Sequence, residues 1–183
     1  WLADAKSHEI SDANAMSLAT VDQFGMPNVR MVLMKSFDRD GCVFYTNLAS
    51  AKGTVIQESK KAAICFHWKT LRRQVRFRGD VKPVSVNEAD EYFASRTRTS
   101  QLGAWASKQS HPLKSKRILL QEVAKFALKF WGRKVPRPEH WSGFRLVPCC
   151  IEFGQEGEYD LPDRCLFTFD RCENLWTKSS LQP

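Results

Sequence analysis

The first 84 residues consist of short strand-like segments separated by turn signals, and this pattern constrains the fold more than any other feature. Apolar residues alternate with polar ones, or run together, over lengths typical of β-strands. The segments are Met16–Val21, Asn28–Phe37, Cys42–Thr46, Ala62–Trp68 and Gln74–Val84. The turn sequences Asp22–Gly25 and Asp38–Gly41 separate the first three, and the second is a strong hairpin signal.

Helical patterns interrupt and follow these strands. Ser50 is a plausible N-cap for a short helix that runs to about Ser59. We expect a second helix over Val86–Ser95, with Asn87 as its cap, and a third over Ser115–Phe130, where apolar residues share one face. The closing strands are predicted at Phe144–Phe153, Cys165–Phe169 and Leu175–Lys178. Strands dominate, so the expected fold class is mainly β with added helices, a barrel rather than alternating βαβ units.

Composition narrows the class of protein. With 183 residues, 43% of them hydrophobic, we expect a single domain over residues 1–183 with one real core. No apolar run approaches the roughly 18 residues of a membrane span, and no signal-peptide pattern opens the chain. We therefore expect no membrane partner. Because the first residue is Trp1 rather than Met, we expect that an N-terminal segment precedes it.

The cysteines and histidines do not suggest a metal site. There is no CxxC pair, and no His stands at zinc-ligand spacing from a Cys. Most cysteines lie in apolar, strand-like stretches, where a free thiol behaves as a small hydrophobe. We interpret them as reduced, which favours a cytoplasmic location. The six are Cys42, Cys65, Cys149, Cys150, Cys165 and Cys172.

The formal charge of +8 calls for an anionic partner or a solvated basic surface. In Asn28–Lys35, Arg30 points to the opposite strand face from Lys35, so one cation faces a ligand and the other reaches it from a bend or an end. A barrel strand with charged ends explains this stretch equally well. In Tyr45–Gly53 a helix begins beside Lys52, and a helix N-terminus with a nearby Lys is a ready phosphate site.

The third basic stretch is Leu71–Gly79. Gln74, Arg76 and Arg78 share one face of its strand. A basic, aromatic-bearing strand suits nucleic acid, but the stretch lacks the stacking pair of RNA-recognition proteins and acidic residues are spread among the basic ones. A solvated basic face is the alternative, and we expect no nucleic-acid partner.

Taken in order, these stretches resemble the pyridoxine/pyridoxamine 5'-phosphate oxidase family. The resemblance covers nearly the whole chain, from Asn14 to about Arg164. Its specific pieces are Arg30-Met-Val-Leu-Met-Lys35, Phe44-Tyr-Thr-Asn47, Ser50-Ala-Lys-Gly53, Arg73-Gln-Val-Arg76, Tyr92-Phe-Ala-Ser-Arg96, Ser100-Gln-Leu-Gly103, Gln109-Ser110 and Val135-Pro-Arg-Pro138. One piece alone means little, whereas the ordered set is specific.

The resemblance implies a homodimeric FMN-binding split β-barrel that oxidises pyridoxine or pyridoxamine 5'-phosphate to pyridoxal 5'-phosphate, with dioxygen as acceptor. The residues that it assigns to FMN, some of them across the subunit interface, are Arg30, Met31, Val32, Leu33, Tyr45, Thr46, Lys52, Gln74, Gln109, Ser110 and Arg164. Those that it assigns to the substrate's 5'-phosphate are Lys35, Tyr92, Arg96 and Ser100. A phosphate dianion needs such fixed cations and hydroxyl donors. The flavin carries the redox chemistry, so no catalytic side chain is identified.

The C-terminal motif departs from the family pattern. Gly154, Asp160 and Pro162 stand where the family has Trp, Arg and His, and Ala51 replaces a cation beside Lys52. Asp160 reverses a charge, and Pro162 can neither donate nor accept a proton. We therefore expect weakened FMN binding and much reduced turnover. An FMN-binding relative with another substrate, such as a phenazine-type precursor, and a non-catalytic binder of FMN or pyridoxal phosphate are the alternatives.

Overall fold

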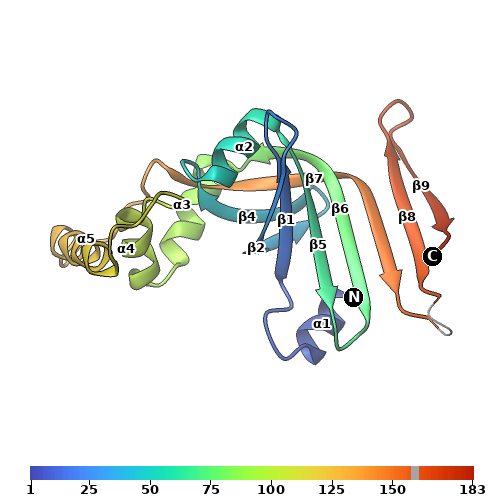
Figure 1. Cartoon of the computed structure of the whole chain (residues 1–183), viewed down its shortest axis with the longest axis horizontal. Coiled ribbons are helices and arrows are strands. Elements are labelled where there is room, and N and C mark those ends of the chain that lie inside the picture. The colour runs from blue at the N-terminus through green and yellow to red at the C-terminus, as the bar shows by residue number, and fades with distance from the viewer. Residues whose placement is uncertain (158–160) are drawn as a thin grey trace.

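The computed structural model describes residues 1–157 and 161–183, and one curled antiparallel sheet dominates it (Figure 1). The strands are β1 (Ala15–Val21), β2 (Pro27–Leu33), β3 (Ser36–Asp38), β4 (Gly41–Asn47), β5 (Lys61–Trp68), β6 (Arg73–Pro83), β7 (Trp141–Gln155), β8 (Asp163–Asp170) and β9 (Leu175–Leu181). The helices are α1 (Leu2–His8), α2 (Ala51–Ser59), α3 (Val86–Ser95), α4 (Arg98–Ala106) and α5 (Lys116–Lys129).

The long strand β7 connects the two ends of the sheet. The strand order is β2-β1-β5-β6-β7-β4-β3, and the β8–β9 hairpin is attached to β7. The first part of β7 pairs with β4, whereas its last part pairs with β8. The β6–β7 register shifts between Arg78 and Gly79, and a Cβ at Gly79 would overlap the carbonyl oxygen of Val147. The two strands can therefore approach closely at this irregularity only because residue 79 is a glycine.

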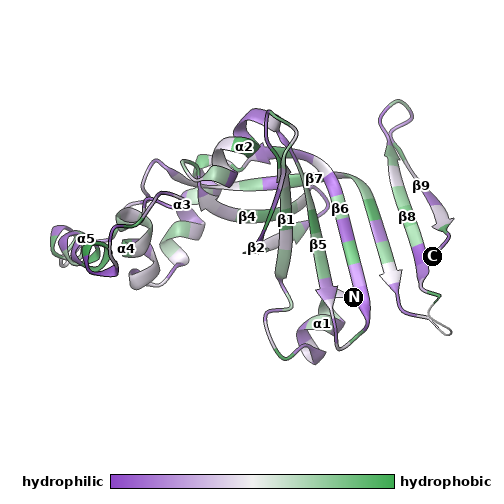
Figure 2. Cartoon of the chain, viewed as in Figure 1, coloured by the Kyte–Doolittle hydropathy of each residue, from purple (hydrophilic) through white to green (hydrophobic). Residues whose placement is uncertain are grey.

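The main core lies inside the curl of the sheet. Alternate residues of β1 are buried, and alternate residues of β6 are hydrophobic (Figure 2). The larger cluster includes Met16, Leu18, Phe44, Ile56, Ile64, Phe66, Val75, Phe77 and Leu146. A second cluster packs α3, α4 and α5 against the start of β7 through Phe93, Leu102, Phe130, Val135 and Trp141. The helical arm is thereby attached beside one end of the sheet.

Most of the predicted elements are confirmed, within a few residues at their ends. Ser50 caps α2, since its Oγ accepts a hydrogen bond from the backbone N–H of Gly53 at 3.3 Å. Ser115 caps α5, which ends close to the predicted residue. All six cysteines are free thiols. None of the helices in the described residues has the length and apolar character needed to cross a bilayer.

Three expectations about local structure were wrong. The strand predicted over Asn28–Phe37 is interrupted at Met34 and Lys35, whose N–H groups donate to the carbonyls of Asn14 and Val43 rather than continuing one ladder. The cap of α3 is Ser85, not Asn87, because the Ser85 hydroxyl already accepts from the N–H of Glu88. Helices α1 and α4 were not anticipated. Each is short, and α4 depends partly on contacts with α3 and α5 that no local pattern reveals.

Candidate active site

A cleft of about 820 Å³ opens where the end of β2 and the end of β4 meet helices α3 and α4. All four residues predicted to hold the substrate phosphate line it: Lys35, Tyr92, Arg96 and Ser100. Most of the residues predicted to bind the cofactor line it as well, namely Met31, Val32, Leu33, Tyr45, Thr46, Lys52 and Gln109. The fold thus brings together residues that are up to 78 positions apart in the sequence, from Met31 to Gln109.

Lys52 lies in the first turn of α2 and lines the cleft, where its ammonium has neutral hydrogen-bond acceptors. Its Nζ donates to Gln109 Oε1 at 2.9 Å and to Thr46 Oγ1 at 3.2 Å, and both acceptors are neutral. Within the described residues, no carboxylate lies at ion-pair distance from it. Burial lowers the pKa of Lys52, and the nearby charge of Arg30 lowers it further. Two adjacent cations with neutral partners favour a dianionic ligand.

Arg30, on β2, adds to the positive charge that acts on Lys52. Its Nη1 donates to the hydroxyl of Thr20 at 2.8 Å and to the carbonyl of Leu18 at 3.1 Å, so β1 holds the guanidinium in place. Burial lowers the pKa of Arg30. These contacts leave other guanidinium N–H groups for a ligand. Arg30 is not among the residues that line the cleft, but its charge contributes to the lowered pKa of Lys52.

Arg96 offers a buried hydrogen-bond donor to an anion. Its guanidinium lies over the ring of Trp141, with Cζ 4.7 Å from the ring centroid. Its Nη1 is buried and has no hydrogen-bond partner in the described part of the chain. An unsatisfied buried donor costs roughly 1–3 kcal/mol, and more for a charged group. A bound phosphate oxygen would remove that cost. Burial also lowers the pKa of Arg96, as expected for a cation with no anionic partner.

A stack of three aromatic rings supports this side of the cleft. Tyr45 stacks on Tyr92 with centroids 4.0 Å apart and on Trp141 at 5.3 Å. Trp141 is 6% exposed, so its ring position is fixed by packing. Sequence reasoning missed Trp141, because a Trp at the start of an apolar strand looks like an ordinary core residue. The β4–β7 register, which pairs Trp141 with Asn47, brings it to the cleft.

Lys35 and Ser100 complete the same side. Lys35 lies in the break between β2 and β3, as expected for a cation that reaches a ligand from a bend. Ser100 lies in the first turn of α4, where its Oγ accepts from the hydroxyl of Thr97 at 2.9 Å. Thr97 caps α4 and also lines the cleft. The sequence signal that could have found Thr97 is its place as a cap residue three positions before Ser100.

The remaining predicted cofactor residues lie elsewhere in this chain. Gln74 and Arg164 flank Gly154 in register on neighbouring strands, near the end of β7 opposite to Trp141. Ser110 follows Gln109 with a left-handed backbone, φ 69°, and is not among the lining residues. The expected set of FMN residues is therefore divided between two regions of one chain.

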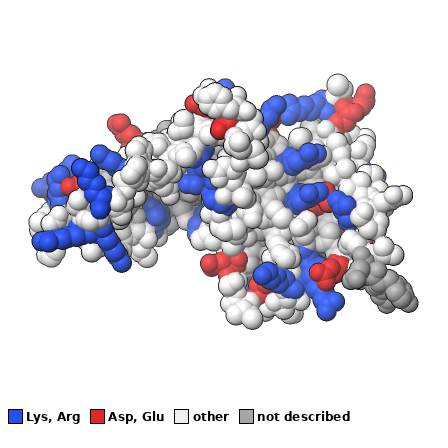
Figure 3. Space-filling view, in the orientation of Figure 1, with Lys and Arg blue, Asp and Glu red and all other residues white. Residues whose placement is uncertain are grey.

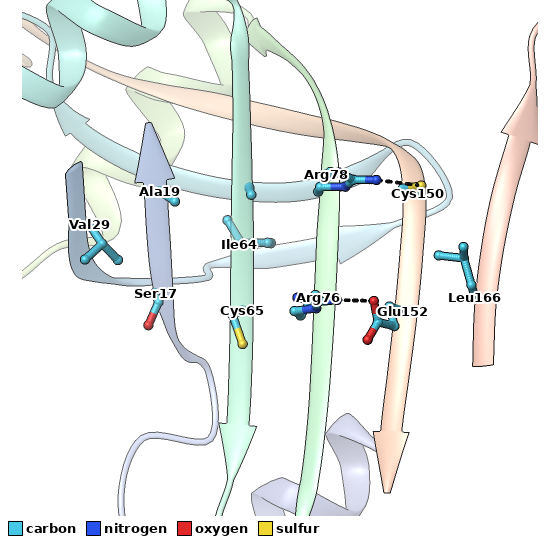
Figure 4. A pocket seen from close by; sticks show the side chains of 11 residues that line it. Ser17, Ala19, Val29, Ile64, Cys65, Arg76, Arg78, Cys150, Glu152 and Leu166 are labelled. Atoms are coloured by element: carbon cyan, nitrogen blue, oxygen red, sulfur yellow. Dashed lines mark hydrogen bonds and ion pairs between the residues drawn. The ribbon is translucent and has the colours of Figure 1, made fainter. Parts of the chain in front are cut away.

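The second region is the open face of β6, β7 and β8. Arg76 points from β6 to Glu152 on β7 beside a hollow of about 360 Å³ (Figure 4). Arg164 Nη2 donates to the other carboxylate oxygen of Glu152 at 2.7 Å. Burial pushes the pKa of Glu152 upward, but the hydrogen bonds from Arg164 and Arg76 outweigh burial and hold it below the usual value.

The altered C-terminal motif is only partly covered by the structure. A Cβ at Gly154 would meet nothing closer than Gln74 at 3.9 Å, so the space beside it is open. Pro162 lines a separate hollow with Trp1 and Phe153. Asp160 lies outside the described residues. The expected loss of turnover therefore remains a prediction.

Comparison with family models gives two consecutive matches. Residues 2–130 match the model described as "Pyridoxamine 5'-phosphate oxidase", and residues 141–183 match the "Pyridoxine 5'-phosphate oxidase C-terminal dimerisation region". This chain belongs to the pyridoxamine 5'-phosphate oxidase family. The family expected from the ordered motifs is thereby confirmed.

Relatives and solved structures agree with this family assignment. A pyridoxine/pyridoxamine 5'-phosphate oxidase from Brucella anthropi is 56% identical over the whole chain and 90% of that relative. One from Maricaulis maris is 55% identical over the whole chain and 82% of that relative. The structure of PhzG from Burkholderia lata 383, in complex with tetrahydrophenazine-1-carboxylic acid, matches with a TM-score of 0.93 and 28% identity, over 100% of this chain and 89% of that one.

A further neighbour confirms the architecture. The pyridoxamine 5'-phosphate oxidase-related, FMN binding protein of Nostoc punctiforme superposes with a TM-score of 0.80 at 19% identity, over 100% of this chain and 95% of that one. At this identity the likeness concerns the fold alone. The split barrel with added helices expected from the sequence is confirmed.

Proposed function

We propose that this chain is an FMN-dependent oxidase that converts pyridoxine or pyridoxamine 5'-phosphate into pyridoxal 5'-phosphate, with dioxygen as the electron acceptor. Relatives of that name, 55–56% identical over the whole chain, support the activity, and the family supports FMN as cofactor. The structural observation that carries the proposal is a single cleft with two groups of cations that have no carboxylate partner in the described residues, at Lys52 and at Arg96.

The Lys52 group fits the FMN phosphate. Lys52 and Arg30 supply two adjacent positive charges, and Thr46 and Gln109 hold the Lys52 ammonium in place. The site also lies at the start of α2, where the helix dipole favours an anion. A phosphate dianion would replace the hydration that these buried cations have lost.

The Arg96 group fits the 5'-phosphate of the substrate. The unpaired Nη1 of Arg96 is a fixed donor, and Lys35, Tyr92 and Ser100 bring an ammonium and two hydroxyls to the same cleft. Because Trp141 holds the guanidinium by stacking, little side-chain entropy is lost when the phosphate binds. The two cation groups lie in one cleft, so the same cleft would hold the phosphates of both ligands.

The protein's part in the reaction is to hold two rings in contact. Bound FMN supplies the hydride acceptor. The side chains of the cleft bind the phosphates, orient the rings and exclude water, which is sufficient for transfer between well-placed partners. This accounts for the reaction without a catalytic triad or a pair of carboxylates.

A homodimer would complete the site. Gln74 and Arg164 lie away from the cleft of their own chain, and Arg164 belongs to the matched dimerisation region. We propose that Gln74 and Arg164 of the partner subunit reach the flavin, while residues 1–183 of each chain form one domain.

We also propose a cytoplasmic location, because six free thiols fit a reducing compartment.

Anaerobic reduction by the substrate tests this function. Protein loaded with FMN should lose its flavin absorbance when pyridoxamine 5'-phosphate is added without oxygen. Admission of air should restore the colour and yield pyridoxal 5'-phosphate. Retention of full flavin absorbance by FMN-loaded protein would exclude this oxidase activity and leave a flavoprotein with another substrate or a non-catalytic binder. Failure to bind FMN at all would remove the whole proposal.

One observation favours a second candidate substrate. A Cβ at Gly154, where the family has a Trp, would meet only Gln74 at 3.9 Å, and the similar PhzG structure contains a tetrahydrophenazine. A flavin that is bleached by a reduced phenazine precursor, but not by pyridoxamine 5'-phosphate, would assign this other activity. If Pro162 and Asp160 only impair the oxidation of pyridoxamine 5'-phosphate, this substrate should still bleach the flavin, but slowly.

A further inference from the structure

The positive charge of the chain is concentrated in one segment. Residues 108–134 contain eight Lys and Arg residues and one acid, Glu122, so this segment carries +7 of the formal charge of +8. The cations are Lys108, Lys114, Lys116, Arg117, Lys125, Lys129, Arg133 and Lys134. Figure 3 shows Lys and Arg gathered over the α5 end of the molecule, and Figure 1 places this end far from the β8–β9 hairpin. The charge therefore belongs to a local surface.

Helix α5 also has two apolar faces, only one of which is used within the chain. Its inner face packs Phe126 and the adjoining Phe130 against Trp105 of α4. On another side, Leu120, Ala124 and Leu128 are spaced four residues apart. Trp131 lies three residues after Leu128, just past the end of the helix. Exposure is 59% for Leu120, 74% for Leu128 and 79% for Trp131. A contiguous exposed apolar stripe of this kind marks an interaction site.

Few of the surrounding cations are neutralised by the protein. Lys125 pairs with Glu122 at 3.6 Å, and Lys129 lies over the rings of the inner face. The other six cations make no ion pair with the described residues. Lys116 and Arg117 lie at the start of α5, while Arg133 and Lys134 lie just past its end. Free positive charge is thus present at both ends of the exposed stripe.

The absence of an apolar run long enough to span a membrane led us to expect no membrane partner, but a helix that lies on a membrane surface needs no such run. Contrary to that expectation, we propose that this surface, the exposed side of α5 with residues 131–134, binds a bilayer that contains anionic lipids. An exposed apolar stripe with Trp and Leu, flanked by Lys and Arg, is the arrangement of helices that lie in a membrane interface. Each Lys or Arg near an anionic leaflet adds electrostatic attraction. The exposed face of a single helix suits a flat surface better than a groove.

Other candidate binding partners would use only some of the features of this surface. A nucleic acid would pair with the cations but gain nothing from Leu128. A second copy of this chain would bring the same positive charge, and the matched dimerisation region is 141–183, outside α5. The cleft proposed as the active site is lined by residues of α3 and α4, not of α5. Membrane binding would therefore be an additional property of the active protein.

Vesicle sedimentation of the full FMN-loaded protein tests the proposal. Vesicles of phosphatidylcholine and phosphatidylglycerol in equal parts should bind the protein, whereas phosphatidylcholine alone should not. Salt at about 1 M should release the protein, since it screens the charges. Subtraction of the Trp131→Phe emission spectrum from that of the wild type gives the emission of Trp131. This emission should shift to shorter wavelength when the protein binds vesicles.

Two variants separate the contributions of the stripe and the charge. One carries Leu128→Ser and Trp131→Ser, and the other carries Lys116→Gln, Arg117→Gln, Arg133→Gln and Lys134→Gln. Each should weaken binding at least about tenfold. Matched controls are Phe24→Ser, an 86% exposed aromatic in the β1–β2 turn, and the exposed set Lys60→Gln, Lys61→Gln, Lys69→Gln and Lys82→Gln. Both controls should bind as the wild type does.

The proposal is overturned by any of four results. These are no binding to anionic vesicles, equal binding to neutral vesicles, equal loss in the control variants, and unchanged binding of the Leu128/Trp131 variant. In the last case, retention of wild type on duplex DNA and loss by the charge variant would assign the surface to nucleic acid. All variants contain the complete active-site cleft, so flavin binding checks that each one is folded.

Discussion

The cleft and the open face of β6–β8 both carry cations that were predicted to bind FMN, Lys52 in the cleft and Arg164 on the open face, but the charges have different partners. On the open face, Arg76 and Arg164 share the carboxylate of Glu152. In the cleft, Lys52 has only neutral acceptors and Arg96 keeps a buried Nη1 with no partner in the described residues. On the open face, a carboxylate of the protein balances the positive charge of the arginines. In the cleft, a bound anion would have to balance it.

Cations that are neutralised by a carboxylate serve to fix the structure, whereas cations without a carboxylate partner are available to bind a ligand. A cation paired with a buried carboxylate is held in one orientation and has little net charge to offer a ligand. A partly buried cation without a counter-ion raises the free energy of the empty protein, and a phosphate that binds there recovers that free energy. We therefore expect substitutions in the cleft to change ligand affinity, and substitutions on the open face to change stability first.

The largest effect is expected from Lys52→Met. Loss of the ammonium removes one of two adjacent charges for the FMN phosphate, so FMN affinity should fall about 30-fold or more, or ~2 kcal/mol. Titration of flavin fluorescence measures this. Lys60→Met, at the exposed C-terminal end of the same helix, is the matched control and should bind FMN normally. Unchanged affinity in Lys52→Met would mean that the cleft is not the FMN phosphate site.

Arg96→Met should act on the substrate and leave FMN in place. The KM for pyridoxamine 5'-phosphate should rise about tenfold or more, because a buried side-chain donor that has no partner in the described residues is removed. Arg96→Lys should rescue the KM only in part, since an ammonium cannot stack on Trp141 and donate as a fork. Steady-state kinetics measures both variants. A fall in kcat with an unchanged KM would contradict a binding role.

Glu152→Gln tests the open face and should show a pH signature. At pH 7 the variant should unfold about 1 kcal/mol more easily, because Arg76 and Arg164 lose their shared carboxylate. The folded-state pKa of Glu152 lies below its usual 4.5, so the wild type has this stabilisation above pH 4.5 and loses it as the pH falls through the folded-state pKa. Urea unfolding at pH 7 and below pH 4 should therefore show the difference shrinking. Glu122→Gln, in an exposed pair, is the control. A pH-independent difference would refute this assignment.

The smallest effect is expected from Gly154→Trp. A Cβ at position 154 would meet nothing closer than Gln74 at 3.9 Å, so the first side-chain atom meets no steric barrier there. If the partner subunit's flavin lies against this strand, the added ring should tighten FMN binding about threefold, or ~0.7 kcal/mol. Gly154→Ala should leave the affinity unchanged. A weaker rather than tighter complex in Gly154→Trp would place the flavin away from this end of β7.

Local sequence patterns predicted most of the elements and failed where distant contacts decide. The Ser50 cap and the Asp38–Gly41 turn depend on neighbouring residues, and both were predicted. The interruption of the predicted strand at Met34 and Lys35 depends on hydrogen bonds to Asn14 and Val43, so no local pattern announces it. Helix α4 has a similar origin, because Gln101 anchors it to the carbonyl of Phe93.

The sequence was enough to predict the family, the succession of strands along the chain and the residues expected to hold two phosphates, because these predictions rest on side-chain type in short motifs. How those residues are grouped depends on the tertiary structure. Long-range pairing of β4 with β7 brought Trp141 under Arg96, and the length of β7 carried Gly154 and Arg164 away from the cleft. Grouping depends on strand register and curl, which result from contacts across the whole sheet and are not written in any one segment.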